Sequence, residues 1–281
     1  MVRVKTTGGQ VLEFDEIVVT CPLGWLKQNL QAFSPSLPER LCKGIQNIGY
    51  GNLEKVSLSP SKLLTPHHHS GADSSKVYIA FPTAFWLTPS PDGGHTVQGF
   101  CQWLAPTYAP DSNPNRWHTE VVELGSLGAF GHPTLLFYTH GEQSHHITST
   151  LRSLPTQKDK DAFIFAYFEP YYSRLPSYDA AKSDCRPSAC LATDWSGDEL
   201  AGCGSYANFQ AGLAEGDADI TAMRDGVPAE GVWLAGEHTA PFVALGTVTG
   251  AYWSGEHVAR RIAQGYCSVR GGREKGVESQ G

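Results

Sequence analysis

The sequence lacks the features that mark secreted, membrane-spanning and disulfide-rich proteins. It has no Asn-x-Ser/Thr sequon, no signal peptide, no Cys-x-x-Cys pair and no apolar run long enough to cross a bilayer, and its seven cysteines are scattered. These absences favour reduced thiols in an intracellular compartment and argue against a membrane partner. We expect a cytoplasmic protein, with the nucleus and the peroxisome as open alternatives.

A basic surface and common catalytic motifs are missing as well. The net charge of -7 argues against nucleic acid as the main partner, and no G-x-S-x-G nucleophile motif is present. The run His67–His69 lies in a Pro/Ser/Gly-rich stretch where three consecutive side chains cannot face one ion, and His145 and His146 are likewise adjacent. We therefore expect neither a nucleic-acid interface nor a metal site.

Turn residues, by contrast, are abundant. The 30 glycines and 18 prolines among 281 residues indicate a mixed α/β protein rather than a helical bundle. Alternating residues on either side of a Thr-Gly-Gly turn predict a hairpin over residues 2–14, and a buried strand is predicted over residues 17–20. A chain that begins in the middle of a sheet suggests that an N-terminal portion is missing.

The rest of the chain alternates between helical and strand periodicities. Apolar residues at helical spacing predict a helix that closes at Gly49. Another helix is predicted from residue 159 to a stop before Pro170, with a strand through Phe163, Phe165 and Tyr167 as the alternative. A last helix begins near Thr247, carries one apolar stripe and ends at Gly265. Strands are predicted over residues 52–59, 76–81, 96–104, 135–138 and 232–235.

Two segments contain glycine patterns of the kind that bind phosphates. GCGSYA (202–207) matches G-x-G-x-x-A, but no apolar strand precedes it, so we interpret the match as accidental. Near the C-terminus, a strand ends in Gly236 and Glu237 and is followed by a Gly/Thr-rich turn and a helix start near Thr247. The unpaired N–H groups of such a helix start can hold a phosphate or the electron-rich edge of a heteroaromatic ring. A plain strand–helix crossover is the alternative.

Three blocks of sequence carry a more specific signal. They are VVTCPLGWLKQ…FSPSLPERLCKGIQNIGYGNLEKVSLS, DWSGDELAGCGSYANFQAG and VWLAGEHTAP…GTVTGAYWSGEHVARRI. In order and spacing they resemble the flavin-dependent amine oxidases, the family of polyamine oxidases, monoamine oxidases and lysine-specific histone demethylases. Together the blocks bracket nearly all of the chain.

The resemblance implies an α/β fold of mixed α+β type. It combines a partial Rossmann-like FAD-binding domain with a mixed-sheet substrate domain, as in flavin amine oxidases. Residues 1–34 and 191–265 are assigned to the FAD-binding domain, residues 35–190 to the substrate-binding domain, and residues 266–281 to a disordered tail.

The resemblance also implies roles for residues around the cofactor. Lys55 matches the lysine that reaches the flavin N5 atom through a water molecule. Gly236 and Glu237 match the motif whose acidic residue lies at the ribityl–pyrophosphate region of the cofactor. Thr247 and Val248 match the helix start whose backbone meets the pyrimidine end of the flavin ring.

Other matched positions concern the flavin face and the substrate. Trp195 and Tyr206 match positions that pack on or before the flavin ring, with core packing as the alternative for Trp195. Tyr206 is expected to form one wall of the amine channel and Thr247 the opposite wall. Pro22 belongs to the first cofactor-binding block.

The sequence departs from the family pattern in three places. The N-terminal βαβ unit with its glycine fingerprint is absent, so the chain resembles the C-terminal portion of an amine oxidase. Thr247 stands where several relatives place a second aromatic residue, which leaves the choice of amine open. One residue is inserted between Trp195 and Gly204, so no role is carried over to the residues between them.

We therefore expect FAD as the cofactor, and a polyamine or another small amine and O2 as reactants. The predicted reaction converts the amine to an imine, with hydride transfer to the flavin N5 atom and reoxidation by O2 to give H2O2. Activity like that of lysine-specific histone demethylases and a non-catalytic fragment unable to hold FAD are the alternatives. A separate N-terminal FAD-binding portion is a candidate partner.

Overall fold

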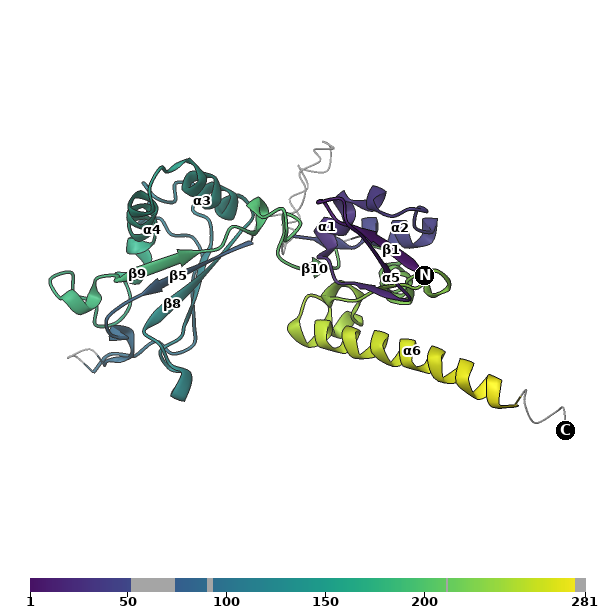
Figure 1. The fold of residues 1–281 in the computed structure, drawn as a ribbon. Coiled ribbons are helices and arrows are strands. Elements are labelled where there is room, and N and C mark those ends of the chain that lie inside the picture. The colour runs from purple at the N-terminus through teal and green to yellow at the C-terminus, as the bar shows by residue number, and fades with distance from the viewer. Residues whose placement is uncertain (52–73, 90–92, 211, 276–281) are drawn as a thin grey trace. The chain divides into compact units, whose positions relative to one another are not determined.

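The computed structural model describes residues 1–51, 74–89, 93–210 and 212–275 (Figure 1). The chain forms two compact units, Met1–Leu64 with Ser196–Gly281, and Thr65–Trp195. Mixed helices and strands confirm the predicted α/β class. The predicted strand over residues 52–59 lies outside the described residues.

The first compact unit continues past residue 34, where the first domain boundary was predicted. Helix α2 (Glu39–Asn47) packs against α5 (Gly216–Asp225), where the fully buried Asp219 accepts hydrogen bonds from Arg40 Nη1 at 2.5 Å and Asn47 Nδ2 at 3.0 Å. A buried carboxylate is tolerated only with such partners, so these bonds tie α2 to the C-terminal half of the chain. The second boundary lies after Trp195 rather than after residue 190. The functional roles of the two units stay predictions.

The first unit consists of small sheets and helices around a main apolar core, with a second, small cluster formed by Trp233, Ala235 and Val258. Besides α2 and α5, its main elements are β1 (Val2–Lys5), β2 (Val11–Phe14), β3 (Ile17–Val19), α1 (Leu23–Gln28), β4 (Gly49–Tyr50), β10 (Ala207–Asn208), β11 (Val232–Leu234) and α6 (Val248–Lys275). Antiparallel pairs join β1 with β2 and β10 with β4, and β11 pairs with β3 in parallel. The hairpin predicted over residues 2–14 is confirmed.

Two predictions in this unit need correction. β3 is a strand as predicted, but it is not buried: Val18 is 41% exposed, so one face of the strand is uncovered. Helix α6 continues through Gly265 to Lys275, so residues 266–275 are helical rather than a disordered tail. A glycine inside a helix costs only about 1 kcal/mol relative to alanine, which does not force an end.

The second unit is a five-stranded antiparallel sheet in the order β6–β7–β8–β5–β9. Its elements are β5 (Ser74–Ala80), β6 (Phe100–Trp103), β7 (Thr119–Glu123), β8 (Thr134–His140), α3 (Gly141–Ser153), α4 (Gln157–Tyr172) and β9 (Ala189–Ala192). Helices α3 and α4 lie on one side of the sheet (Figure 1) and share a core with Val77, Val121 and Phe137. Strands β5, β6 and β8 were predicted, whereas β7 and β9 were not.

Helix α4 extends beyond its predicted end. Pro170 lies inside the helix, which ends at Tyr172 rather than before the proline. The core aromatic residues Tyr171 and Tyr172 are both buried, so packing holds this last turn despite the missing N–H donor.

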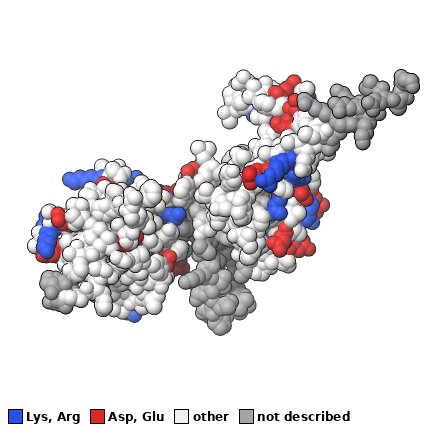
Figure 2. Space-filling view, turned by 90° about the horizontal axis from the view of Figure 1, so that it is seen from below, with Lys and Arg blue, Asp and Glu red and all other residues white. Residues whose placement is uncertain are grey.

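Figure 2 shows charged side chains in small groups on the face in view. Among the described residues, no helix combines the length and the apolar character needed to span a membrane.

Candidate functional site

The centre of the candidate site is the Glu237 carboxylate. Glu237 follows β11 and opens a short 3-10 turn, and its two oxygens accept the backbone N–H of Ala207 at 3.0 and 3.2 Å. Burial raises the pKa of Glu237, and hydrogen bonds from the backbone N–H groups of Ala207 and Gly246 partly offset that rise. One carboxylate thereby joins β10, the end of β11 and the turn that leads into α6.

That turn depends on a glycine. Gly246 has a φ of 73°, and a Cβ there would lie 2.8 Å from the carbonyl oxygen of Ala207 and 3.1 Å from Cδ2 of Tyr206. The backbone conformation and the close approach both require glycine. The Tyr206 ring thus packs on the turn immediately before the start of α6.

The start of α6 has an N-cap that the sequence analysis missed. Thr247 Oγ1 accepts the N–H of Gly250 at 2.9 Å and donates to the Ala244 carbonyl at 2.8 Å. The N–H groups of Val248 and Thr249, in the first turn, have no acceptor within the helix. Val248 is 88% exposed, so this helix start presents N–H donors and a partial positive charge at the surface.

A buried histidine supports the turn after β11. Gly236 has a φ of 150° and donates its N–H to Ser254 Oγ at 2.9 Å. A Cβ on Gly236 would lie 2.7 Å from the ring of His238, which is 1% exposed. Burial lowers the pKa of His238 to about 4, so the imidazole is neutral at neutral pH. His238 Nε2 has no hydrogen-bond partner among the described residues.

The glycine pattern at 202–207 has a packing role. A Cβ on Gly202 would lie 2.2 Å from the Trp25 nitrogen, and one on Gly24 would lie 2.1 Å from the Gly202 carbonyl oxygen. The backbone at Gly24 and the backbone at Gly202 therefore cross in direct contact. Gly24 lies at the start of α1, just after Pro22. This agrees with our interpretation that the match to a dinucleotide fingerprint is accidental.

Sequence reasoning missed Tyr50 in the same region. Tyr50 pairs with Ala207 across β4 and β10, and its hydroxyl donates to the Ala201 carbonyl at 2.6 Å. Burial, together with nearby Glu237 and Asp198, raises the pKa of Tyr50 to about 12. The phenol therefore stays protonated. A cross-strand partner cannot be read from local sequence pattern.

The first unit thus brings the segment of Tyr206 close to Glu237 and to the turn before Thr247 and Val248, and it also contains Gly236 and Pro22. Trp195 is exposed and is the last residue of the second unit, and Lys55 lies outside the described residues. The roles of all eight residues stay predictions.

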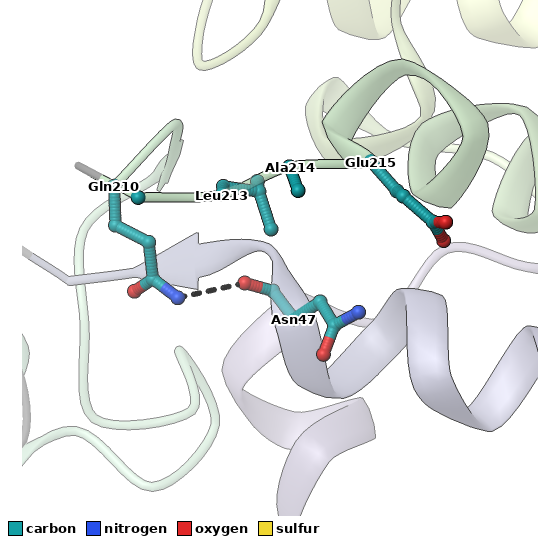
Figure 3. A pocket seen from close by; sticks show the side chains of 6 residues that line it. Asn47, Gln210, Leu213, Ala214 and Glu215 are labelled. Carbon is teal, nitrogen blue, oxygen red and sulfur yellow. Dashed lines mark hydrogen bonds between the residues drawn. The ribbon is translucent and has the colours of Figure 1, made fainter.

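No group of three or more His, Cys, Asp or Glu side chains in the described part of the chain is arranged to hold a metal ion. His67–His69 lie outside the described residues. An open hollow of about 350 Å³ lies beside α2 and α5 (Figure 3), where Gln210 Nε2 donates to the Asn47 carbonyl at 2.9 Å. It contains none of the predicted cofactor residues.

The helix start fits one end of a flavin. Several apolar side chains around it are exposed, namely Phe242, Val243, Val248, Tyr252 and Trp253. A flat ring with carbonyl acceptors on its edge can accept the N–H groups of Val248 and Thr249 and bury apolar surface beside them. The half-buried Glu237 holds this turn in place.

Comparison with known proteins points in the same direction. The family described as "Flavin containing amine oxidoreductase" matches residues 1–263. The chain is 26% identical over 263 residues to lysine-specific histone demethylase 1 homolog 3 of Oryza sativa subsp. indica, covering 93% of this chain and 26% of the relative. It is 26% identical over 276 residues to the protein FLOWERING LOCUS D of Arabidopsis thaliana, covering 96% of this chain and 28% of that protein.

Shorter and structural matches complete the comparison. Probable polyamine oxidase 4 of Arabidopsis thaliana is 35% identical over 66 residues, which are 24% of this chain and 13% of the relative. A redesigned putrescine oxidase (TM-score 0.51) and the cyclohexylamine oxidase of Brevibacterium oxydans (TM-score 0.50) share the fold at 17% identity, covering 90% of this chain and 45% of theirs. The chain thus spans about a quarter of the length of the first curated relatives.

Proposed function

The chain belongs to the flavin-containing amine oxidoreductases, and from this premise we propose that it takes part in the FAD-dependent oxidation of a small amine, such as a polyamine, to an imine. FAD as the cofactor is supported by the family itself and by the amine oxidases that share the fold. When bound, FAD accepts a hydride from the carbon next to the amine nitrogen and is reoxidised by O2, giving H2O2.

The observation that carries the proposal is the turn built by Glu237 before α6. The Gly246 turn and the N–H groups of Val248 and Thr249 would hold the acceptor edge of the flavin ring. Thr247 caps the helix, which fixes the direction of those N–H groups. We expect Glu237 to act through this turn, because its oxygens already accept backbone N–H groups.

Two further residues are assigned to the amine. Tyr206 would form an apolar wall that excludes water from the amine. The close contact between its ring and Gly246 sets the distance between the ring and the start of α6. Lys55, which lies outside the described residues, would orient the water used in proton handling.

A non-catalytic role is the second candidate, and one observation favours it. Large apolar side chains are exposed in the first unit, on the hairpin (Val11, Leu12 and Phe14) and on α6 (Tyr252 and Trp253). Exposed apolar surface of this kind marks interaction sites. A separate FAD-binding portion would cover such surfaces, and without it the chain would not retain the cofactor.

Purification in the presence of FAD separates the two candidates. The proposal predicts that flavin co-elutes with the chain during gel filtration and shows a protein-bound visible spectrum. Elution of a colourless, monodisperse protein would contradict FAD binding by this chain and support the non-catalytic role. Activity like that of the demethylase relatives predicts oxidation of a methylated lysine peptide in preference to a free polyamine.

A further inference from the structure

A basic cluster lies where the end of α5 meets α6, and it consists of Arg224, His257, Arg260 and Arg261. Arg224 is in the last turn of α5, and the other three residues are on α6. Arg261 Nη1 donates to the Arg224 carbonyl at 2.8 Å, which joins the two helices. Positive charge is thus concentrated at this place, although the chain as a whole carries a net charge of -7.

The Arg224 guanidinium is fixed by a neutral partner. Arg224 is half-buried, and its Nε donates to the Thr239 carbonyl at 2.8 Å. Within the described part of the chain, Arg224 forms no ion pair, and its two terminal nitrogens have no acceptor. A guanidinium held through Nε presents these nitrogens as a fork whose N–H groups match two oxygens of one anion.

Trp233 holds the second guanidinium of the cluster. The Cζ atom of Arg261 lies 4.8 Å from the centroid of the Trp233 ring. Its ion pair with Asp225 spans 3.7 Å, which is longer than a hydrogen bond, and the Asp225 side chain is 62% exposed. Water screens such a contact, so the charge of Arg261 is only partly compensated.

His257 lies in the electrostatic field of these arginines. Burial lowers its pKa, and the charges of Arg261 and Arg224 lower it further. Arg260 acts in the same direction, while Asp225 opposes it. The imidazole is therefore neutral at neutral pH, and His257 is exposed to solvent. An anion bound beside it would offset the repulsion that the arginines exert on its proton.

We propose that the basic cluster binds the phosphate group of a small molecule, held by the terminal nitrogens of Arg224 and by Arg261, with His257 at its edge. A phosphate carries enough oxygens and charge to bind two guanidiniums at once. The site goes beyond the amine oxidation proposed above, because it uses none of the residues assigned to FAD or to the amine. At about 1.5 Å per residue, His257 lies roughly 14 Å along α6 from Val248.

The cluster couples anion binding to a proton. A bound dianion raises the pKa of His257, so by linkage the anion binds more tightly as the pH falls through that pKa. The charged groups that face His257 are Arg260 and Arg261 on its own helix and Arg224 and Asp225 on α5. The arginines stay protonated throughout, and an Asp225→Asn variant removes the carboxylate from this set.

Titration of the isotope-labelled chain with inorganic phosphate, without FAD, tests the proposal. Chloride keeps the ionic strength constant, and the reporter is the ring C–H signal of His257, assigned by its loss in His257→Gln. Phosphate is expected to shift this signal saturably and to raise the pKa of His257. Sulfate, whose charge does not change between about pH 7.5 and 5.5, is expected to bind more tightly at the lower pH. Glycerol phosphate distinguishes the sources: its binding identifies a phosphate monoester, and binding of inorganic phosphate alone identifies the free ion.

Three variants and a control complete the test. Arg224→Gln is expected to weaken phosphate binding by about tenfold or more, because it removes the charge and the fork together. Arg224→Lys keeps the charge without the fork and should lie between this variant and the wild type. Asp225→Asn, at an exposed side chain, should strengthen binding by about two- to fivefold.

The control is Arg3→Gln, which removes the same charge from the exposed Arg3–Glu13 pair of the hairpin and should leave binding unchanged. Wild-type affinity in folded Arg224→Gln, or an equal loss in Arg3→Gln, would overturn the proposal. So would the lack of a saturable shift in both the wild type and Asp225→Asn.

Discussion

The turn before α6 makes a strong prediction about two glycines that are close in sequence. Gly246→Ala introduces a Cβ at a φ of 73°, 2.8 Å from the Ala207 carbonyl oxygen and 3.1 Å from the Tyr206 ring. Gly255→Ala introduces the same methyl group within α6, where a Cβ meets nothing within 4 Å. Both substitutions add the same methyl group, so any difference between their effects on stability comes from the backbone conformation and the space around each glycine.

The expected effects have opposite signs. The left-handed conformation costs alanine about 1–2 kcal/mol, and the contact with a backbone oxygen adds strain, so Gly246→Ala should lose about 1–3 kcal/mol of unfolding free energy. Gly255→Ala should gain about 0.5–1 kcal/mol, because alanine favours the helix. Urea denaturation followed by circular dichroism measures both.

Cofactor binding adds a second readout. Gly246→Ala should weaken FAD binding even under conditions in which the variant is fully folded, because it displaces Tyr206 and the N–H groups at the start of α6. Gly255→Ala should bind FAD like the wild type. An unchanged stability of Gly246→Ala, or equal FAD affinity of the two variants, would refute the structural role given to this turn.

Three further predictions concern buried charged and titratable groups. Glu123 is 1% exposed and accepts hydrogen bonds from three backbone N–H groups and the Trp86 indole, so Glu123→Gln should destabilise the second unit by about 3 kcal/mol in urea denaturation. These bonds outweigh burial and lower the pKa of Glu123, so its stabilising contribution is present at neutral pH and is lost as the pH falls through that lowered pKa. Asp219→Asn weakens the hydrogen bonds that join α2 to α5 and should lower the unfolding free energy of the first unit by about 2–4 kcal/mol. Asp217 is exposed on the same helix, so Asp217→Asn should have little effect. Equal effects of the two substitutions would contradict the role of Asp219. His238 has a pKa lowered to about 4, so the unfolded state binds its proton more readily and up to about 3 kcal/mol of stability should be lost as the pH falls from about 6.5 to 4. His238→Gln should remove most of that pH dependence in thermal unfolding, and an unchanged slope would show that His238 does not cause it.

Local patterns in the sequence predicted much of the fold. The hairpin over residues 2–14, the strand at 232–234 and helix α2 each have a clear periodicity and a turn or cap at their ends. β7 was missed because its alternation is short and lies between loop-like segments. The end of α6 was misplaced because a glycine stops a helix only where its left-handed conformation is used, and Gly265 remains helical.

The candidate site was predictable only in part. The strand–turn–helix around Gly246 and Thr247 follows from residues that are adjacent in the chain. The bonds from Glu237 to Ala207 and the crossing of Gly24 with Gly202 join residues far apart in sequence, and no local pattern contains them. The bonds of Asp219 to α2, which join residues 39–47 to the C-terminal half of the first unit, likewise appear only in the folded chain.

Anaerobic addition of putrescine to the FAD-loaded protein tests the proposed function most directly. We expect the amine to bleach the visible absorption of the oxidised flavin, and we expect the absorption to return when O2 is admitted, with release of H2O2. A bound flavin whose spectrum does not change with putrescine or other small amines would contradict amine oxidation as the function of this protein.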